Sequence, residues 1–151
     1  MGASQRRIVL HVDDDPQVTR VMSERLRLCD FETHALNDPS RALDELVHHQ
    51  YRVVLLDIDM PDLDGVQLLK EIKHYDGGIQ VIMLTGISNV STVLAAFRGG
   101  AEACFLKPMA DIQPLAQALD DAFHKINRWW DTLQHLSQQR HAIDIAAAVG
   151  I

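Results

Sequence analysis

The 151-residue sequence predicts a doubly wound α/β fold, in which helices cover both faces of a five-stranded parallel sheet. Apolar runs alternate with helical patterns five times along the chain, as in repeated strand–helix units. Most of these runs are continuously apolar, which is typical of parallel strands buried on both faces. Polar and charged residues follow several runs directly. In such folds the ligand site lies at the carboxyl ends of the strands.

The five expected strands differ in how apolar they are. One run alternates polar and apolar residues, which indicates a half-buried strand, and the others indicate full burial. In chain order they are "RIVLHV" ending at Val12, "FETHAL" (31–36), "YRVVLLD" (51–57), "IQVIMLT" (79–85) and "ACFLK" (103–107).

The helices between them have recognisable ends. An aspartate followed by proline is a helix start, with the aspartate as N-cap and the proline in the first turn. Asp15-Pro16 and Asp38-Pro39 begin two helices in this way. Further helices are expected over 64–73 and 89–100, the latter closed by two glycines. A long C-terminal helix begins near Asp111.

Composition excludes several classes of protein. The formal net charge of −7 and the lack of a basic stripe argue against direct binding of nucleic acid. No apolar run is long enough to cross a bilayer, and the N-terminus is a poor signal peptide. Cys29 and Cys104 lie far apart and form no C-x-x-C pair, which fits a reducing cytoplasm.

The strand ends bring chemically useful groups to one edge of the predicted sheet. Clustered carboxylates suit a hard cation such as Mg²⁺, and a carboxylate can also accept a phosphoryl group. A lysine can pair with that group as a point charge. The cation also explains how the carboxylates stay ionised beside one another. The residues at this edge are Asp13, Asp14, Asp57, Asp59, Thr85 and Lys107.

Four motifs at these strand ends resemble the receiver domain of two-component response regulators. They are "VDDDP", "LLDIDMPDLDG", "LTG" and "FLKP", and the resemblance covers about residues 6–125. It implies a flavodoxin-like sheet with strand order 2-1-3-4-5, as in the chemotaxis regulator of this family. It also implies a cis peptide bond before Pro108.

The resemblance implies a role for each site residue. Asp57 is the phospho-acceptor, Thr85 the switch hydroxyl and Lys107 the phosphoryl-binding cation. Mg²⁺ or Mn²⁺ is held by Asp57 with the acidic pair, of which Asp14 is the direct ligand, and by the backbone carbonyl of Asp59. The acidic pair is Asp13 and Asp14.

The implied function is that of a phosphorylation-controlled signalling switch. A sensor histidine kinase or a phosphotransfer protein is the expected phosphoryl donor. The domain turns over no free substrate, so it is not expected to be an enzyme. Two alternatives stay open: a phosphatase of the haloacid-dehalogenase type, whose acidic pair comes last rather than first in the chain, and a degenerate receiver used only for docking.

One position departs from the family pattern. The family usually has Tyr or Phe three residues before the lysine, whereas this chain has Cys104 there and Phe105 one place later. A shift by one residue along a strand turns the side chain to the other face. We therefore expect that Phe105 cannot replace the usual switch aromatic.

The chain continues past the expected end of the receiver domain. Residues 1–125 are expected to form that domain, and 126–151 a helical extension or linker. Apolar residues recur at alternating spacings of three and four, the period of a coiled coil, so we expect a homodimer through this helix. The stripe is Ile112, Leu115, Leu119, Ala122, Ile126, Trp129, Leu133 and Leu136.

Other polar residues have structural interpretations. His11 lies within a buried strand and is expected to be a core histidine with its hydrogen bonds satisfied, rather than a phosphorylation site. Asp15 is expected to cap a helix rather than bind a metal, and Asp62 and Asp64 to be loop and cap residues. The side chain of Asp59 is expected to be solvated, with only its carbonyl used.

Overall fold

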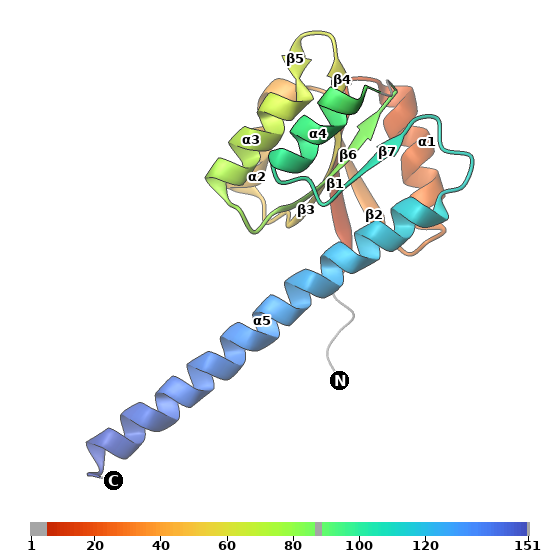
Figure 1. Cartoon of the computed structure of the whole chain (residues 1–151). Helices are drawn as coiled ribbons and strands as arrows, with labels where there is room; N and C mark the ends of the chain where they lie inside the picture. The colour runs from red at the N-terminus through yellow and green to blue at the C-terminus, as the bar shows by residue number, and fades with distance from the viewer. Residues whose placement is uncertain (1–5, 87–88, 151) are drawn as a thin grey trace.

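The computed structural model describes residues 6–86 and 89–150 as a five-stranded parallel sheet with helices on both faces (Figure 1). The sheet order is β2-β1-β3-β6-β7. Because β4 and β5 form a separate hairpin, this is the predicted 2-1-3-4-5 order. The strands are β1 (Ile8–Val12), β2 (Glu32–Leu36), β3 (Val53–Asp57), β6 (Gln80–Thr85) and β7 (Ala103–Leu106).

Five helices divide between two hydrophobic layers. Residues of α2, α3 and α4 pack on one face of the sheet, and residues of α1 and α5 pack on the other. Alternate residues of the central strand β3 pack into the two layers. Val54 and Leu56 pack with α2, α3 and α4, and Val53 and Leu55 pack with α1 and α5. The helices are α1 (Pro16–Arg27), α2 (Ala42–His48), α3 (Gly65–Tyr75), α4 (Val90–Arg98) and α5 (Gln113–Ala148).

The predicted helix caps are present. Asp15 accepts a hydrogen bond from the backbone N–H of Gln17 at 2.9 Å, and Asp64 accepts one from Val66 at 2.9 Å. Asp38 caps a short 3₁₀ turn, η1 (Pro39–Arg41), which precedes α2. The predicted start is therefore correct, but the first turn is tighter than an α-helix.

A small antiparallel hairpin was not predicted. It pairs β4 (Asp59–Met60) with β5 (Leu63–Asp64) and stands beside the carboxyl edge of the sheet. Each strand has two residues, too few for any periodic pattern to appear in the sequence. The hairpin matters because it fixes the backbone that follows Asp57.

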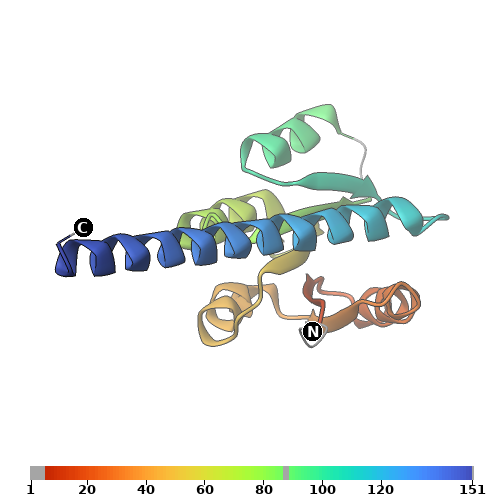
Figure 2. The same ribbon diagram turned by 90° about the horizontal axis from the view of Figure 1, so that it is seen from below.

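Helix α5 is much longer than the sheet it covers (Figures 1 and 2). Its buried residues end at Ile126, and the helix then continues without a break to Ala148. The boundary expected near residue 125 thus falls inside one continuous helix, and Ile151 lies outside the described residues. None of the described helices combines the length and hydropathy that a membrane span requires.

Candidate functional site

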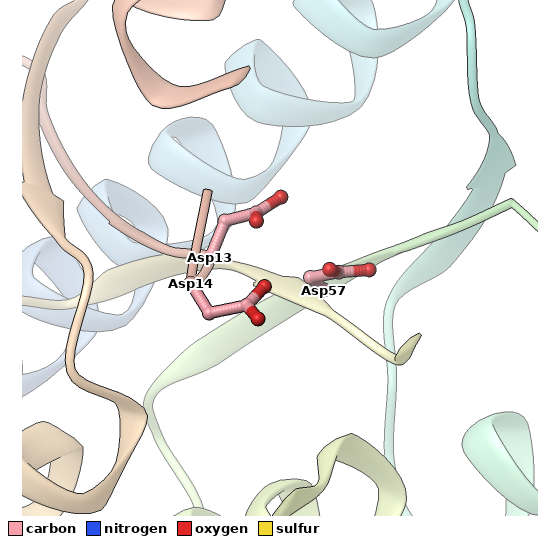
Figure 3. A group of neighbouring side chains, drawn as sticks. All are labelled: Asp13, Asp14 and Asp57. Carbon is pink, nitrogen blue, oxygen red and sulfur yellow. The ribbon is translucent and has the colours of Figure 1, made fainter. Parts of the chain in front are cut away.

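Three aspartates meet at the carboxyl edge of the sheet (Figure 3). Asp13 and Asp14 follow β1 directly, and Asp57 is the last residue of the adjacent strand β3. One carboxylate oxygen from each lies within 4.8 Å of the other two. Asp13 and Asp57 are buried, whereas Asp14 is exposed. An acidic group of this geometry can hold a hard cation with one side open to water.

Lys107 connects the two buried carboxylates. It follows β7, and its Nζ lies 3.2 Å from Asp13 Oδ2 and 3.1 Å from Asp57 Oδ1. Burial disfavours the charged ammonium, but attraction to Asp57 and Asp13 outweighs burial, so the pKa of Lys107 lies above its usual value. The lysine therefore remains a cation at the centre of this edge.

The environment of Asp57 disfavours its ionised form. Burial is the largest effect and raises the pKa of this carboxyl, and the charge of Asp13 raises it further. The backbone N–H of Asp59, which donates to Asp57 Oδ1 at 3.1 Å, and the ammonium of Lys107 oppose this rise. A divalent cation beside these carboxylates would favour their ionised form in the same way.

Asp13 is held in place by hydrogen bonds from Asp15 and Asn37. Its Oδ1 accepts a hydrogen bond from the backbone N–H of Asp15 at 3.0 Å. Asn37, just after β2, donates to the Asp13 carbonyl at 2.8 Å and to the Thr19 hydroxyl at 3.2 Å. Asn37 was not among the predicted site residues. Its only signal in the sequence is its place one residue after an edge strand.

The side chain of Asp59 was expected to be solvated, and this expectation is wrong. Its Oδ2 accepts a hydrogen bond from the Thr85 hydroxyl at 3.0 Å and another from the Gly86 backbone N–H at 2.6 Å. The hairpin and the end of β6 bring these groups together, although 26 residues separate Asp59 from Thr85. The carboxylate thus links the loop after β3 to the loop after β6.

Gly65 permits a close approach of backbone under the site. A Cβ at this position would lie 2.4 Å from the carbonyl oxygen of Asp57 and 2.7 Å from the Cα of Ile58. Both are backbone atoms that cannot turn away, so a larger residue forces the start of α3 away from Asp57. The sequence showed a glycine at a helix start, but not what it contacts.

Cys104 and Phe105 lie on opposite faces of β7, as predicted. Cys104 packs against the layer of α2, α3 and α4, and Phe105 against the layer of α1 and α5. Burial and the charge of Asp59 raise the pKa of the Cys104 thiol, which favours its protonated form. Phe105 therefore does not occupy the place of the usual switch aromatic.

One further expectation is confirmed at this edge, and a second only in part. The peptide bond between Lys107 and Pro108 is cis. His11 is fully buried, and burial lowers its pKa to about 4, so it is a neutral core residue, as expected. Neither of its ring nitrogens has a hydrogen-bond partner among the described residues, so the expectation that its polar atoms are satisfied is wrong.

A scan against family models matches residues 9–120 to the response regulator receiver domain. The chain belongs to this family. Among curated relatives, the regulatory protein AtoC of Escherichia coli (strain K12) is 38% identical over 100 residues, which is 66% of this chain and 22% of the relative. The CpxR homolog of Haemophilus influenzae is 35% identical over 109 residues, 72% of this chain and 47% of that protein. The chain spans less than half the length of these relatives.

Solved receiver domains have the same fold. The beryllofluoride-activated NtrC4 receiver domain dimer is 28% identical, with a TM-score of 0.73 over 80% of this chain and 98% of that one. A CheY-like receiver domain from Methanospirillum hungatei JF-1 shares the fold with a TM-score of 0.75 at 22% identity, covering 82% of this chain and 98% of that one. These matches agree with the predicted receiver domain rather than with a haloacid-dehalogenase-type phosphatase.

Proposed function

We propose that this receiver domain accepts a phosphoryl group on Asp57 from a phosphohistidine of a sensor histidine kinase or a phosphotransfer protein. One observation carries the proposal: Asp57 ends a central strand with Lys107 and the acidic pair gathered around its carboxylate. The relatives are named as regulatory proteins, and this chain spans only part of their length. We infer that phosphorylation of the domain controls a partner or an output domain.

The acidic residues fit a magnesium site. The carboxylates of Asp13, Asp14 and Asp57 would hold Mg²⁺, or Mn²⁺ in its place, together with the backbone carbonyl of Asp59. When bound, the cation supplies positive charge to the oxygens of the transferring group. The exposed side of Asp14 leaves a route for the ion to enter.

The chain's own residues perform the transfer by positioning and charge. A carboxylate oxygen of Asp57 attacks the phosphorus in line, the phosphorus–nitrogen bond of the donor breaks, and the histidine leaves with the bonding electrons. An aspartyl phosphate remains. Lys107, already within 3.1 Å of Asp57 Oδ1, can pair with the new phosphoryl oxygens. Hydrolysis of the aspartyl phosphate resets the domain, which makes it a switch rather than an enzyme with a free substrate.

The contacts of Asp59 suggest how the switch responds. In this structure Thr85 and Gly86 donate to the Asp59 carboxylate. A phosphoryl group on Asp57 offers new acceptor oxygens to the same hydroxyl. Movement of Thr85 toward them would release the loop after β6 and shift the population of output surfaces.

The proposal is tested by phosphorylation with acetyl phosphate and Mg²⁺, followed by intact-protein mass. We expect one added phosphoryl group on the chain and none on Asp57→Asn. Asp62→Asn, an exposed acidic residue of the same loop, is the matched control and should be labelled as the unchanged chain is. Asp14→Asn should need more Mg²⁺ for the same labelling. Failure of the unchanged chain to be labelled or to bind Mg²⁺ would favour the docking module instead.

A further inference from the structure

One face of α5 carries mostly apolar side chains, interrupted by Arg140, but the sheet covers only the first half of the helix. Leu119 and Ile126 are buried, whereas Leu133 is 56% and Ile143 67% exposed. We call residues 127–148 of α5 the stalk. Alternating spacings of three and four continue along it through Trp129, Leu133, Leu136, Arg140, Ile143 and Ala147. A sustained stripe of this kind is typical of a helix that pairs with another helix.

The first part of the stripe within the stalk, Trp129 and Leu133, faces a groove beneath the receiver domain. The groove has a volume of about 1000 Å³ and runs between the stalk and the N-terminal ends of β1, β3 and β6. The stalk contributes Trp129, Trp130 and Leu133 to it, and the underside of the domain contributes Val47, Tyr51 and Tyr75 among others. Any helix that covers the stripe at this level must therefore lie in the groove.

We propose that the groove is filled by the stalk of a second copy of this chain, running antiparallel, so that each stalk tip lies in the groove of the other copy. The tip is residues 141–150. The stalk is about 33 Å long at about 1.5 Å per residue, which is enough to reach from one groove to the other.

A parallel pairing fits the structure poorly. The receiver domain lies on the same side of α5 as the stripe, because the stripe is the face that packs on the sheet. In a parallel pair of straight helices, both receiver domains would need the same space between the helices. A parallel pair would also place Arg140 against its own copy, and Trp129 against its own copy. An antiparallel pair puts the domains at opposite ends and places neither Arg140 nor Trp129 directly against its own copy.

The antiparallel register brings the tryptophans of the groove against small side chains. With the two-fold axis near Gln138, Leu133 faces Ile143 of the second copy, and Trp129 faces Ala147. The three alanines at 146–148 thus meet the two tryptophans of the groove, and such large-to-small matching lets facing layers interdigitate.

The charges of the tip and the groove also match. Residues 141–151 contain Asp144 and no lysine or arginine. The C-terminal end of a helix carries partial negative charge as well. The charged residues that line the groove include Arg6, Arg7, Arg52 and Asp76. Arg7 and Arg52 already pair with Asp120 and Asp76, whereas Arg6 has no ion pair within the described part of the chain and is the positive charge left for the tip.

This pairing is independent of the proposed phosphoryl chemistry. The groove lies at the N-terminal ends of the strands, and Asp57 at their carboxyl ends. We therefore expect a dimer in the resting state, with the same mass when beryllium fluoride and Mg²⁺ are added.

The first test is the light-scattering mass of the full chain. We expect twice the 17.0 kDa chain mass, and a fall to the monomer with Leu133→Asp, which places a charge in the stripe. Gln138→Asp adds the same charge on the opposite face of the stalk and should remain a dimer. Leu133 is half-exposed in one copy, so circular dichroism should show an intact receiver domain in the monomer. A monomeric unchanged chain, or a dimer insensitive to Leu133→Asp, would overturn the proposal.

The second test is the direction of the stalks. In a chain with Cys29→Ser and Cys104→Ser, we would introduce Thr132→Cys or Ala146→Cys, both beside the stripe. Antiparallel stalks bring position 132 of one copy to position 146 of the other, so mixed chains should form a disulfide-linked dimer. Each variant alone should not, because its two thiols lie about 20 Å apart along the helices. Efficient cross-linking of Thr132→Cys with itself would show parallel stalks and contradict the proposal.

Discussion

The two ends of the sheet carry different kinds of side chains, charged at one end and largely aromatic at the other. At the carboxyl end, charged groups from three strands lie about 3 Å apart and compensate one another, as Lys107 does between Asp13 and Asp57. At the N-terminal end, the aromatic rings of Trp129, Trp130 and Tyr51 line an open groove. The first end depends on the placement of a few charges, whereas the second depends on the shape left by a helix longer than its sheet. Substitutions at the two ends should therefore differ in how they change the stability of the domain and its dependence on pH and Mg²⁺.

The largest loss of stability is expected from Lys107→Met. Removing the ammonium leaves two buried carboxylates facing each other, and breaking a buried pair in this way costs about 3 kcal/mol in the free energy of unfolding. Urea unfolding without metal measures the loss, and added Mg²⁺ should recover part of it. Lys70→Met, an exposed lysine of α3, is the matched control. Equal stability of the two variants would mean that the charges at this end are not coupled.

Gly65→Ala should be next in size. Its Cβ would lie 2.4 Å from the Asp57 carbonyl oxygen, so the start of α3 must shift at a cost of about 2 kcal/mol. Because the shift moves the backbone of Asp57, labelling by acetyl phosphate should slow as well. Gly77→Ala, where a Cβ would meet only the Lys73 carbonyl oxygen at 3.7 Å, should change stability little. A crystal structure of Gly65→Ala with the backbone of Asp57 in the same position as in the unchanged chain would contradict this explanation of the slower labelling.

Asp57→Asn should stabilise the metal-free protein by less than Gly65→Ala destabilises it. The pKa of Asp57 is raised by burial, so its contribution to stability is present below its ordinary pKa and is lost as pH rises through the raised value. The neutral amide avoids that loss. The midpoint temperatures of thermal unfolding, measured as a function of pH, should be similar for the two proteins in acid and should differ increasingly toward neutral pH. The same difference in midpoint temperature at every pH would mean that the ionisation of Asp57 is not the cause of the stabilisation.

Asp59→Ala should make the domain easier to activate. The substitution removes the acceptor that holds the Thr85 hydroxyl and the Gly86 N–H, and one such hydrogen bond contributes about 1 kcal/mol. We expect beryllium fluoride with Mg²⁺ to bind several-fold more tightly, as followed by titration calorimetry. Asp62→Ala in the same loop should bind as the unchanged chain does. Weaker binding by Asp59→Ala would mean that Asp59 supports the activated state instead.

The smallest effect is expected at the N-terminal end. Arg52 donates to Asp76 at 2.7 Å at the edge of the groove, and this hydrogen bond lowers the pKa of Asp76. Stability from this pair is present above the ordinary carboxyl pKa and is lost as pH falls through the lowered value, opposite in sign to Asp57. Both side chains are 37% exposed, so Asp76→Asn should cost less than about 1 kcal/mol in urea unfolding at neutral pH. A cost as large as that of Lys107→Met would make the two ends equivalent.

Local features of the site were predictable from the sequence. Asp15 and Asp64 cap their helices because an aspartate before a helical pattern can bond the free N–H groups of the first turn. Asp13, Asp57, Thr85 and Lys107 gather at one edge because parallel strands end on the same side. The position of Cys104 opposite Phe105 follows from the alternation of side chains along a strand. The functional roles of these residues remain predictions until phosphorylation is measured.

The remaining features depend on contacts between distant segments. A two-residue strand such as β4 has no period to recognise, so its effect on Asp59 appeared only in three dimensions. Asn37 and Gly65 looked ordinary because their importance lies in the backbone atoms that come near them.

The sequence by itself determined the parallel sheet, the acidic edge and the apolar period of the last helix, because each is a local pattern or follows from strand order. Only the tertiary structure decided that Asp59 holds Thr85, and that Trp129 and Leu133 of the stripe line a groove under their own domain. The physical reason is that a helix period fixes which residues share a face. What that face meets depends on where the sheet ends, and no local pattern records this.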